Sequence, residues 1–146
     1  MTAYDNDNPF AKILRGELPS HKIYEDAETF AFMDIMPRSP GHCLVIPKRP
    51  SRNILDADPA VLAPLMQTAQ KLSRAVMTAL QADGVRVAQF NEAASGQTVF
   101  HLHIHVIPCF SGRGLGPEGG PVEKPEILAE NARKIREALD ATETER

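Results

Sequence analysis

The sequence predicts an α+β fold in which an antiparallel sheet of about five strands carries a long central helix, a short N-terminal helix and a C-terminal helix. Its strand-like runs follow one another without a regular alternation of strand and helix, which favours antiparallel pairing with helices on one face. One long segment keeps its apolar residues at helical spacing throughout. The 146 residues suit one ordinary domain. We expect this domain to span residues 1–146, with a core at about 9–108 and a C-terminal loop and helix over 109–146.

Two shorter segments carry helix signals. Pro9 suits the first position of a short helix, and Gly16 suits its end. Residues 125–140 have their apolar positions on one stripe and form the predicted last helix.

The longest periodic segment predicts the central helix. Its apolar residues recur three or four positions apart: Leu62, Leu65, Met66, Ala69, Leu72, Val76, Met77 and Leu80. Asp58 and Pro59 suit its start and Gly84 its end. Pro64 removes an internal hydrogen bond, so we expect it to kink the first turns.

Five short runs predict strands because they are rich in β-branched, aromatic or alternating apolar residues. They are residues 22–25, 29–35, 42–46, 85–90 and 99–107. The first two form a hairpin across a turn at Asp26. Residues 112–124 are rich in glycine and proline and predict a loop.

Composition excludes several classes of protein. The net charge is −3 and the basic clusters are short, so no stripe of positive charge suits a nucleic acid polymer. No apolar run approaches the ~18–20 residues that span a membrane, and the polar, acidic N-terminus does not resemble a signal peptide. Cys43 and Cys109 lie inside or beside strand-like runs, where a free cysteine packs as a small hydrophobic residue. Two free thiols rather than a disulfide indicate a reducing compartment. We therefore expect a cytoplasmic protein with no membrane partner.

A run of alternating histidines is the main functional signal. His101, His103 and His105 share one side of a predicted strand, while the intervening apolar residues share the other. Three histidines on one face argue against ordinary core packing.

Two chemical explanations compete for this run. Histidines two apart on a strand can bind zinc, but no Cys-x-x-Cys or His-Glu-x-x-His motif completes such a site. Alternatively, one imidazole attacks phosphorus while its neighbours donate hydrogen bonds and move protons, with no metal and no cofactor.

The same residues resemble a known family. Gly96-Gln97-Thr98-Val99-Phe100 followed by His101-Leu102-His103-Ile104-His105-Val106-Ile107 is similar to the signature of the histidine triad (HIT) family. Two upstream blocks, Asp34-Ile35-Met36-Pro37 and Gly41 to Lys48, resemble that family's second conserved region. The match runs from about Pro9 to Pro108 and is closest to the Hint-like branch of nucleotide phosphoramidases and nucleotidyl hydrolases.

This resemblance implies a HIT-like fold, a homodimer whose sheets join, and a purine nucleotide substrate. It implies a transient nucleotidyl-histidine on His103, with His105 and Gln97 contacting the phosphate or the leaving group. His101 and His42 would tune and orient the triad, completing the catalytic set. The other implied nucleotide-binding residues are Asp34 for ribose, Asn91 and Thr98 for the phosphate–ribose region, and Phe10, Ile13, Phe32 and Ile35 around the base.

The resemblance implies cleavage at the α-phosphorus of adenylate-type substrates: phosphoramidates, acyl-adenylates or dinucleoside polyphosphates. AMP or GMP would be released. The alternative is a nucleotide-binding regulatory or scaffold protein with weak, incidental turnover.

Two departures from the family pattern matter. Many bacterial relatives carry a Cys-x-x-Cys near the first helix that helps to hold structural zinc, whereas this chain has Asn8-Pro9-Phe10-Ala11 there. We therefore predict no zinc. Thr98 replaces the usual serine, which keeps a hydroxyl and adds a methyl group.

Overall fold

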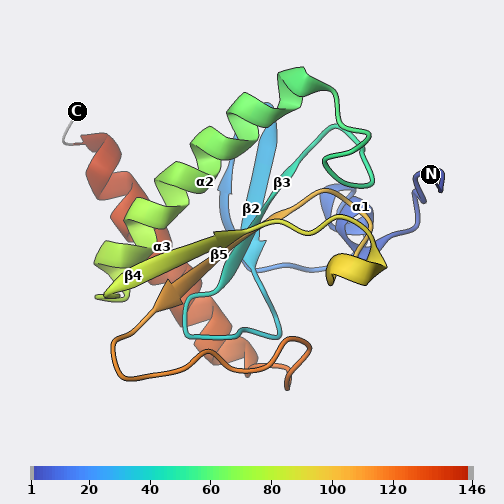
Figure 1. Ribbon diagram of the computed structural model, residues 1–146. Helices are drawn as coiled ribbons and strands as arrows, with labels where there is room; N and C mark the ends of the chain where they lie inside the picture. The colour runs from blue at the N-terminus through green and yellow to red at the C-terminus, as the bar shows by residue number, and fades with distance from the viewer. Residues whose placement is uncertain (1, 145–146) are drawn as a thin grey trace.

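The computed structural model describes residues 2–144 and contains one five-stranded sheet with three α-helices (Figure 1). The elements in chain order are α1 (Pro9–Leu14), β1 (Lys22–Glu25), β2 (Thr29–Met33), β3 (Cys43–Pro47), α2 (Pro59–Ala79), β4 (Gly84–Ala88), β5 (Ile104–Cys109) and α3 (Pro125–Thr144). The strand order is β1-β2-β3-β5-β4, and every neighbouring pair is antiparallel. The predicted α+β fold is therefore confirmed.

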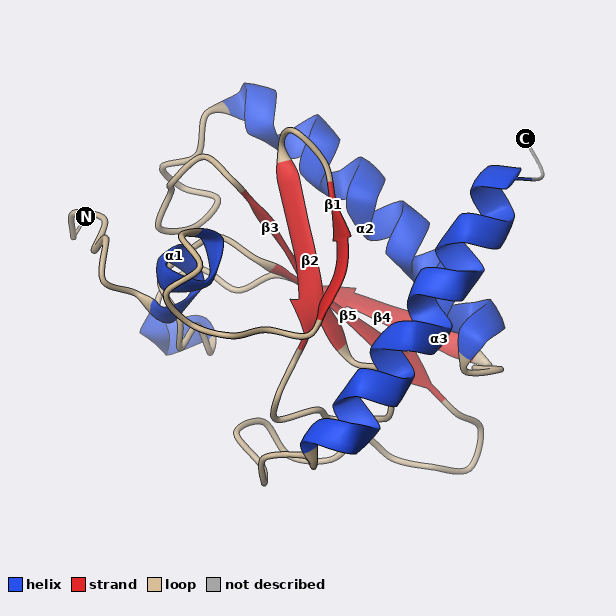
Figure 2. Cartoon of the chain, turned by 180° about the vertical axis from the view of Figure 1, so that it is seen from behind, coloured by secondary structure: helices blue, strands red, loops and turns tan. Residues whose placement is uncertain are grey.

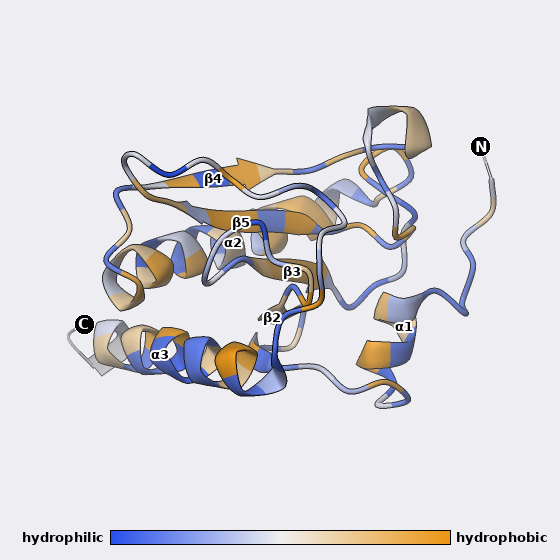
Figure 3. Cartoon of the chain, turned by 90° about the horizontal axis from the view of Figure 1, so that it is seen from below, coloured by the Kyte–Doolittle hydropathy of each residue, from blue (hydrophilic) through white to orange (hydrophobic). Residues whose placement is uncertain are grey.

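The two faces of the sheet carry different layers. One face packs on α2 and α3, and its buried residues include Ala31, Met33, Cys43, Val45 and Val106. The alternate residues form a second cluster on the opposite face: Phe30, Phe32, Leu44 and Ile46, with Phe10 of α1. Figures 2 and 3 show α2 and α3 together against the sheet, with α1 apart from both. Helices thus cover the expected face, while α1 contributes to the other.

Side-chain caps explain where the first two helices begin. Asn8 caps α1 by accepting hydrogen bonds from the backbone N–H groups of Phe10 at 3.0 Å and Ala11 at 2.9 Å. Asp58 caps α2 by accepting from the Ala60 N–H at 2.9 Å. The helix α2 runs unbroken through Pro64 because its buried stripe holds it to the sheet.

The last strand begins later than its sequence pattern predicts. β5 starts at Ile104 rather than residue 99, and the Leu102 N–H donates to the Ser51 carbonyl at 2.9 Å instead of to a strand. The alternation nevertheless continues, since Leu102 and Ile104 both lie in the main core.

Two loops meet below the sheet. The loop from β2 to β3 turns at Gly41, where φ is +89° and an added Cβ would lie 2.9 Å from the Leu80 side chain, so only glycine fits. The loop from β5 to α3 lies beside it (Figure 1): the Gly116 N–H donates to the Arg38 carbonyl at 2.8 Å, and the Glu123 N–H to the Ile35 carbonyl at 2.8 Å. No helix in the described part of the chain has the length and apolarity needed to cross a membrane.

Candidate active site

Strand register places the histidines beside the second cluster. Phe32 is paired with Leu44, and Leu44 with His105. Directly paired residues of antiparallel strands project from the same face. The His105 side chain therefore lies on the face opposite α2, next to the aromatic residues of β2.

An apolar pocket opens on this face with a volume of about 430 Å³. It contains all four apolar residues that the resemblance assigns to the base, Phe10, Ile13, Phe32 and Ile35, together with Asp34, Thr98, His103 and His105. Exposed hydrophobic side chains gather at its rim, including Ile35 at 49% and Leu18 at 40% exposure. A concave apolar surface with a few polar groups is typical of a small-molecule site.

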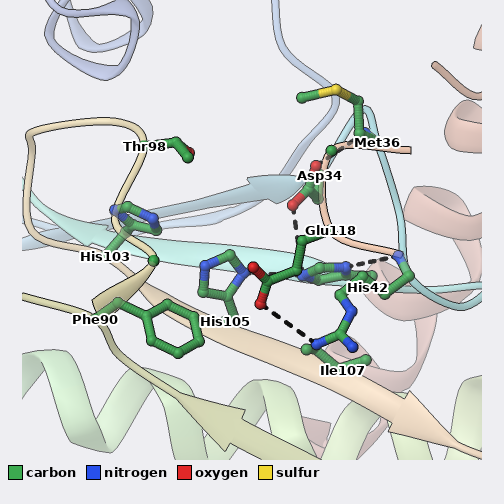
Figure 4. A pocket seen from close by; sticks show the side chains of 12 residues that line it. Asp34, Met36, His42, Phe90, Thr98, His103, His105, Ile107 and Glu118 are labelled. Atoms are coloured by element: carbon green, nitrogen blue, oxygen red, sulfur yellow. Dashed lines mark hydrogen bonds and ion pairs between the residues drawn. The ribbon is translucent and has the colours of Figure 1, made fainter. Parts of the chain in front are cut away.

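A second, more polar pocket of about 200 Å³ lies beside the first. Asp34, Met36, Thr98, His103 and His105 line both pockets. Figure 4 shows the rings of His103 and His105 next to each other, with Phe90, His42 and Glu118 around them. The two histidines thus stand at the junction of the pockets.

The hydrogen bonds of His103 define its tautomer. Its Nδ1 lies 2.7 Å from the carbonyl oxygen of His101, which can only accept, so Nδ1 carries the proton. Burial lowers the pKa of His103, and the carbonyl opposes this shift. His103 is therefore neutral near pH 7, and its Nε2 keeps a free lone pair, as a nucleophile requires.

His42 and His105 form a polarised chain. The Arg38 backbone N–H donates to His42 Nδ1 at 3.0 Å, so the His42 proton is on Nε2 and is donated to His105 Nδ1 at 3.0 Å. His105 then carries its proton on Nε2. Burial, followed by neighbouring positive charge, lowers the pKa of His42 to about 3 and that of His105 to about 4, so both are neutral donors near pH 7.

Asp34 is a buried carboxylate with an unusual pKa. Burial raises its pKa from 3.8 to about 6, against the stabilising N–H of Met36, which donates to Oδ1 at 2.8 Å. Its Oδ2 lies 3.4 Å from His42 Nε2. Because His42 is uncharged, this is a weak polar contact rather than an ion pair.

His101 lies away from both pockets. It is completely buried, its Nε2 donates to the Pro47 carbonyl at 2.8 Å, and its Nδ1 accepts from the Tyr4 hydroxyl at 2.6 Å. Its effect on His103 comes through its own carbonyl oxygen. This geometry suits an orienting role.

Gln97 and Asn91, which the resemblance assigns to nucleotide binding, lie outside both pockets, and their amides are hydrogen bonded within the protein. Gln97 is 3% exposed; its amide donates to the carbonyls of Arg52 and Val99 and accepts from Asn53 and the Glu92 N–H. The Asn91 amide oxygen likewise accepts from the Ile54 N–H at 2.9 Å. Neither residue lines the pockets. Both amides instead hold the loop that carries Thr98, because the loop's backbone polar groups need partners.

The residues present do not fit the structural zinc site that the family resemblance implies. At the two cysteine positions, Asn8 caps α1 and Ala11 has no ligand atom. His101, the triad histidine that contacts the N-terminal segment through Tyr4, has both ring nitrogens hydrogen bonded and so offers no free ligand atom there.

Within the described part of the chain, Asp34, His42 and His105 form a group whose possible ligand atoms all lie within 4.8 Å of one another. However, His42 Nε2 carries the proton, so it cannot coordinate an ion without losing the bond from Arg38 to Nδ1.

Sequence reasoning missed several residues that line the polar pocket. Phe90 had a usable signal, because it lies two positions beyond Ala88, which pairs with His105. Arg38 and Glu118 had none, since a long connection brings their loops together. The Tyr4 contact with His101 spans 97 residues and was equally invisible.

Comparison with known proteins confirms the family that the sequence resembles. The HIT domain family model matches residues 15–112. An uncharacterized HIT-like protein of Mycobacterium tuberculosis is 37% identical over 131 residues, covering 89% of this chain and 91% of that protein. The adenylylsulfatase HINT3 of Arabidopsis thaliana is 40% identical over 103 residues, covering 70% of this chain and 52% of its own length.

Solved structures give the same result. A HIT-like protein involved in cell-cycle regulation from Bartonella henselae is 57% identical with a TM-score of 0.88, covering 93% of this chain and 99% of that one. A zinc-bound histidine triad family protein from Mycobacterium smegmatis is 33% identical with a TM-score of 0.86, covering 96% and 98%. The chain belongs to the HIT family, whose members are nucleotide-binding proteins and hydrolases.

Proposed function

We propose that this protein cleaves adenylate-type substrates at the α-phosphorus through a nucleotidyl intermediate on His103. The observation that carries the proposal is the tautomer of His103: its Nδ1 proton is held by the His101 carbonyl at 2.7 Å, so Nε2 is unprotonated at the junction of the two pockets. The name of the Arabidopsis relative, an adenylylsulfatase, supports this class of reaction.

The apolar pocket suits the nucleoside. Phe10 and Phe32 pack edge to face with their ring centroids 5.2 Å apart and offer an apolar surface to a purine. Asp34 lies beside them, and a carboxylate can accept from both ribose hydroxyls. A base and ribose held there would bring the α-phosphorus to the junction.

The first chemical step forms the bond between His103 Nε2 and phosphorus while the bond to the leaving group breaks. The leaving atom takes the electron pair, and an amine leaving group is protonated by solvent. His105 donates its Nε2–H to a phosphoryl oxygen, where negative charge develops. His42 fixes this tautomer by donating to His105 Nδ1.

In the second step, water attacks phosphorus and gives up one proton to solvent, while the bond between phosphorus and His103 breaks and returns its electron pair to Nε2. The products are the nucleoside monophosphate and the free enzyme. Across both steps, one water is consumed for each substrate cleaved.

We also propose that the protein is a homodimer whose sheets join through β4. Among the described strands β4 pairs with β5 alone, so its other edge has free backbone groups. Val87 on this strand is 45% exposed.

The test is a rapid alkaline quench after mixing with adenosine 5′-phosphoramidate, followed by mass spectrometry of the peptides. We expect an adenylyl adduct on the peptide that contains His103. His103→Ala should lower turnover by about 10⁴-fold or more, as other nucleophile deletions do.

His21→Ala is the matched control, because His21 lines neither pocket. Its turnover should equal that of the parent. Tight AMP binding with negligible turnover by the parent protein would favour the regulatory alternative and overturn the proposal.

A further inference from the structure

The polar pocket has one cationic side chain, Arg38, and the neighbours of Arg38 accept few of the hydrogen bonds that its guanidinium can donate. Among the residues lining this pocket, Arg38 alone carries a positive charge near pH 7, because the pocket's three histidines are neutral. Its Nε donates to the Gly116 carbonyl at 3.0 Å, which fixes the guanidinium at the pocket wall. Its Nη1 lies 3.7 Å from Glu118 Oε1, beyond hydrogen-bonding distance. The terminal nitrogens of Arg38 therefore have donors to spare.

Glu118 is loosely held and can be displaced. Its side chain is 57% exposed, it makes no hydrogen bond to another described residue, and Gly119 and Gly120 follow it directly. A charge-assisted pair with full hydrogen bonds would lie about 2.7–2.9 Å apart. The carboxylate of Glu118 thus occupies the position where an anion would bind Arg38, but it does not bind Arg38 tightly.

The position of Arg38 relates it to the leaving group. His103 stands between the two pockets. When a nucleoside occupies the apolar pocket, the polar pocket is therefore available to the group that departs from phosphorus. Phe90, Met36 and Ile107 supply apolar walls there, and Arg38 supplies the fixed charge. Asp34, the other acid in this pocket, faces the ribose side as well.

We propose that the polar pocket selects leaving groups that carry an anionic group, which replaces Glu118 on the Arg38 guanidinium. This inference rests on the proposed function, because it takes the polar pocket as the leaving-group side of His103. A planar guanidinium suits a carboxylate or sulfate oxygen pair. Glu118 then acts as an internal competitor that keeps Arg38 paired when no substrate is bound.

Matched substrates test this selection. The adenosine 5′-phosphoramidates of glycine and of glycinamide break the same P–N bond and differ by one negative charge on the leaving group. Adenosine 5′-phosphosulfate is the second anionic arm, which separates a sulfate leaving group from a carboxylate on an amine. The readout is the kcat/KM for each anionic substrate divided by that for the glycinamide compound.

The parent protein should prefer at least one anionic substrate. Arg38→Gln should lower its preference by about tenfold or more, since a hydrogen bond to a charged group is lost. Glu118→Gln should raise the preference, because the competitor has lost its charge. Arg113→Gln is the control: Arg113 lies over the Phe110 ring on the same loop and lines neither pocket, so the preference should not change.

Equilibrium binding to the His103→Ala protein separates this inference from the proposed function. The same preference, and its loss with Arg38→Gln added, should appear in the ratio of dissociation constants even if the parent protein turns nothing over. An equal effect of Arg38→Gln on charged and neutral compounds would overturn the inference. A preference of the parent protein for the glycinamide compound that disappears in Glu118→Gln would also overturn the inference. Failure of the protein to bind any of the three compounds would overturn it as well.

Discussion

Replacing Asp34 by asparagine should stabilise the fold, and the gain should grow with pH. The asparagine side chain would keep an Oδ1 acceptor for the Met36 N–H, which now donates at 2.8 Å, while removing the buried charge. Burial raises the pKa of Asp34 from 3.8 to about 6, and its side chain is 16% exposed. Because the folded pKa is the higher one, this group contributes stability that is complete below pH 3.8 and is lost as pH rises through about 6.

The size of the effect follows from the shift. At 1.36 kcal/mol per pKa unit, the raised pKa of Asp34 lowers the free energy of unfolding by about 3 kcal/mol at pH 8 and by about 1.5 kcal/mol at pH 5, where the folded protein still holds the proton. Urea unfolding of parent and Asp34→Asn at both pH values should therefore show a stabilisation that grows by about 1.5 kcal/mol toward pH 8. Asp58→Asn is the control, since the N–H of Ala60 and then Arg49 lower the pKa of Asp58 and asparagine caps a helix equally well. A gain that is absent, or that shrinks as pH rises, would refute the buried-carboxylate reasoning.

Three further predictions concern single side chains. Tyr4→Phe removes the hydroxyl that donates to His101 Nδ1 at 2.6 Å, so urea unfolding should show a loss of about 1–3 kcal/mol; an unchanged midpoint would contradict that bond. Leu72→Ala, at a position with 0% exposure in the main core, should cost about 2–5 kcal/mol, and a cost below about 1 kcal/mol would contradict the assigned packing. Burial, then the nearby carboxylate Asp34, raises the pKa of Cys43 to about 12, so a thiol reagent should modify the half-buried Cys109 first; equal rates would be the contrary result.

The regular elements could be predicted because their signals are local. Pro9 is the first residue of α1, and Asp58 caps the start of α2, as the sequence predicts. Phe32 and Leu44 lie on the opposite face from their neighbours in the strand, as alternating side chains do. The predicted start of β5 at residue 99 was wrong, because a strand also needs a partner strand. The Leu102 N–H donates to the Ser51 carbonyl instead, and β5 begins at Ile104. Periodicity in one segment contains no information about that partner.

The part of the site that could be predicted consists of side chains on strands or in line with them. Phe32, His103 and His105 reach the pockets because alternate residues share a face. The amide of Gln97 is hydrogen bonded to loop backbone at Arg52 and Glu92, and the sequence does not display these partners because they depend on how the loops fold. Arg38 and Glu118 could not be paired in advance, because the fold brings together two loops 78 to 80 residues apart.

The tautomers of the histidines are the most direct test of how the site works. Long-range ¹H–¹⁵N NMR of the imidazole nitrogens at pH 7 should find His103 neutral with its proton on Nδ1, and His42 and His105 neutral with their protons on Nε2. That pattern leaves one bare nitrogen facing the substrate and a donor beside it. A proton on His103 Nε2, or an imidazolium at that position, would contradict the account.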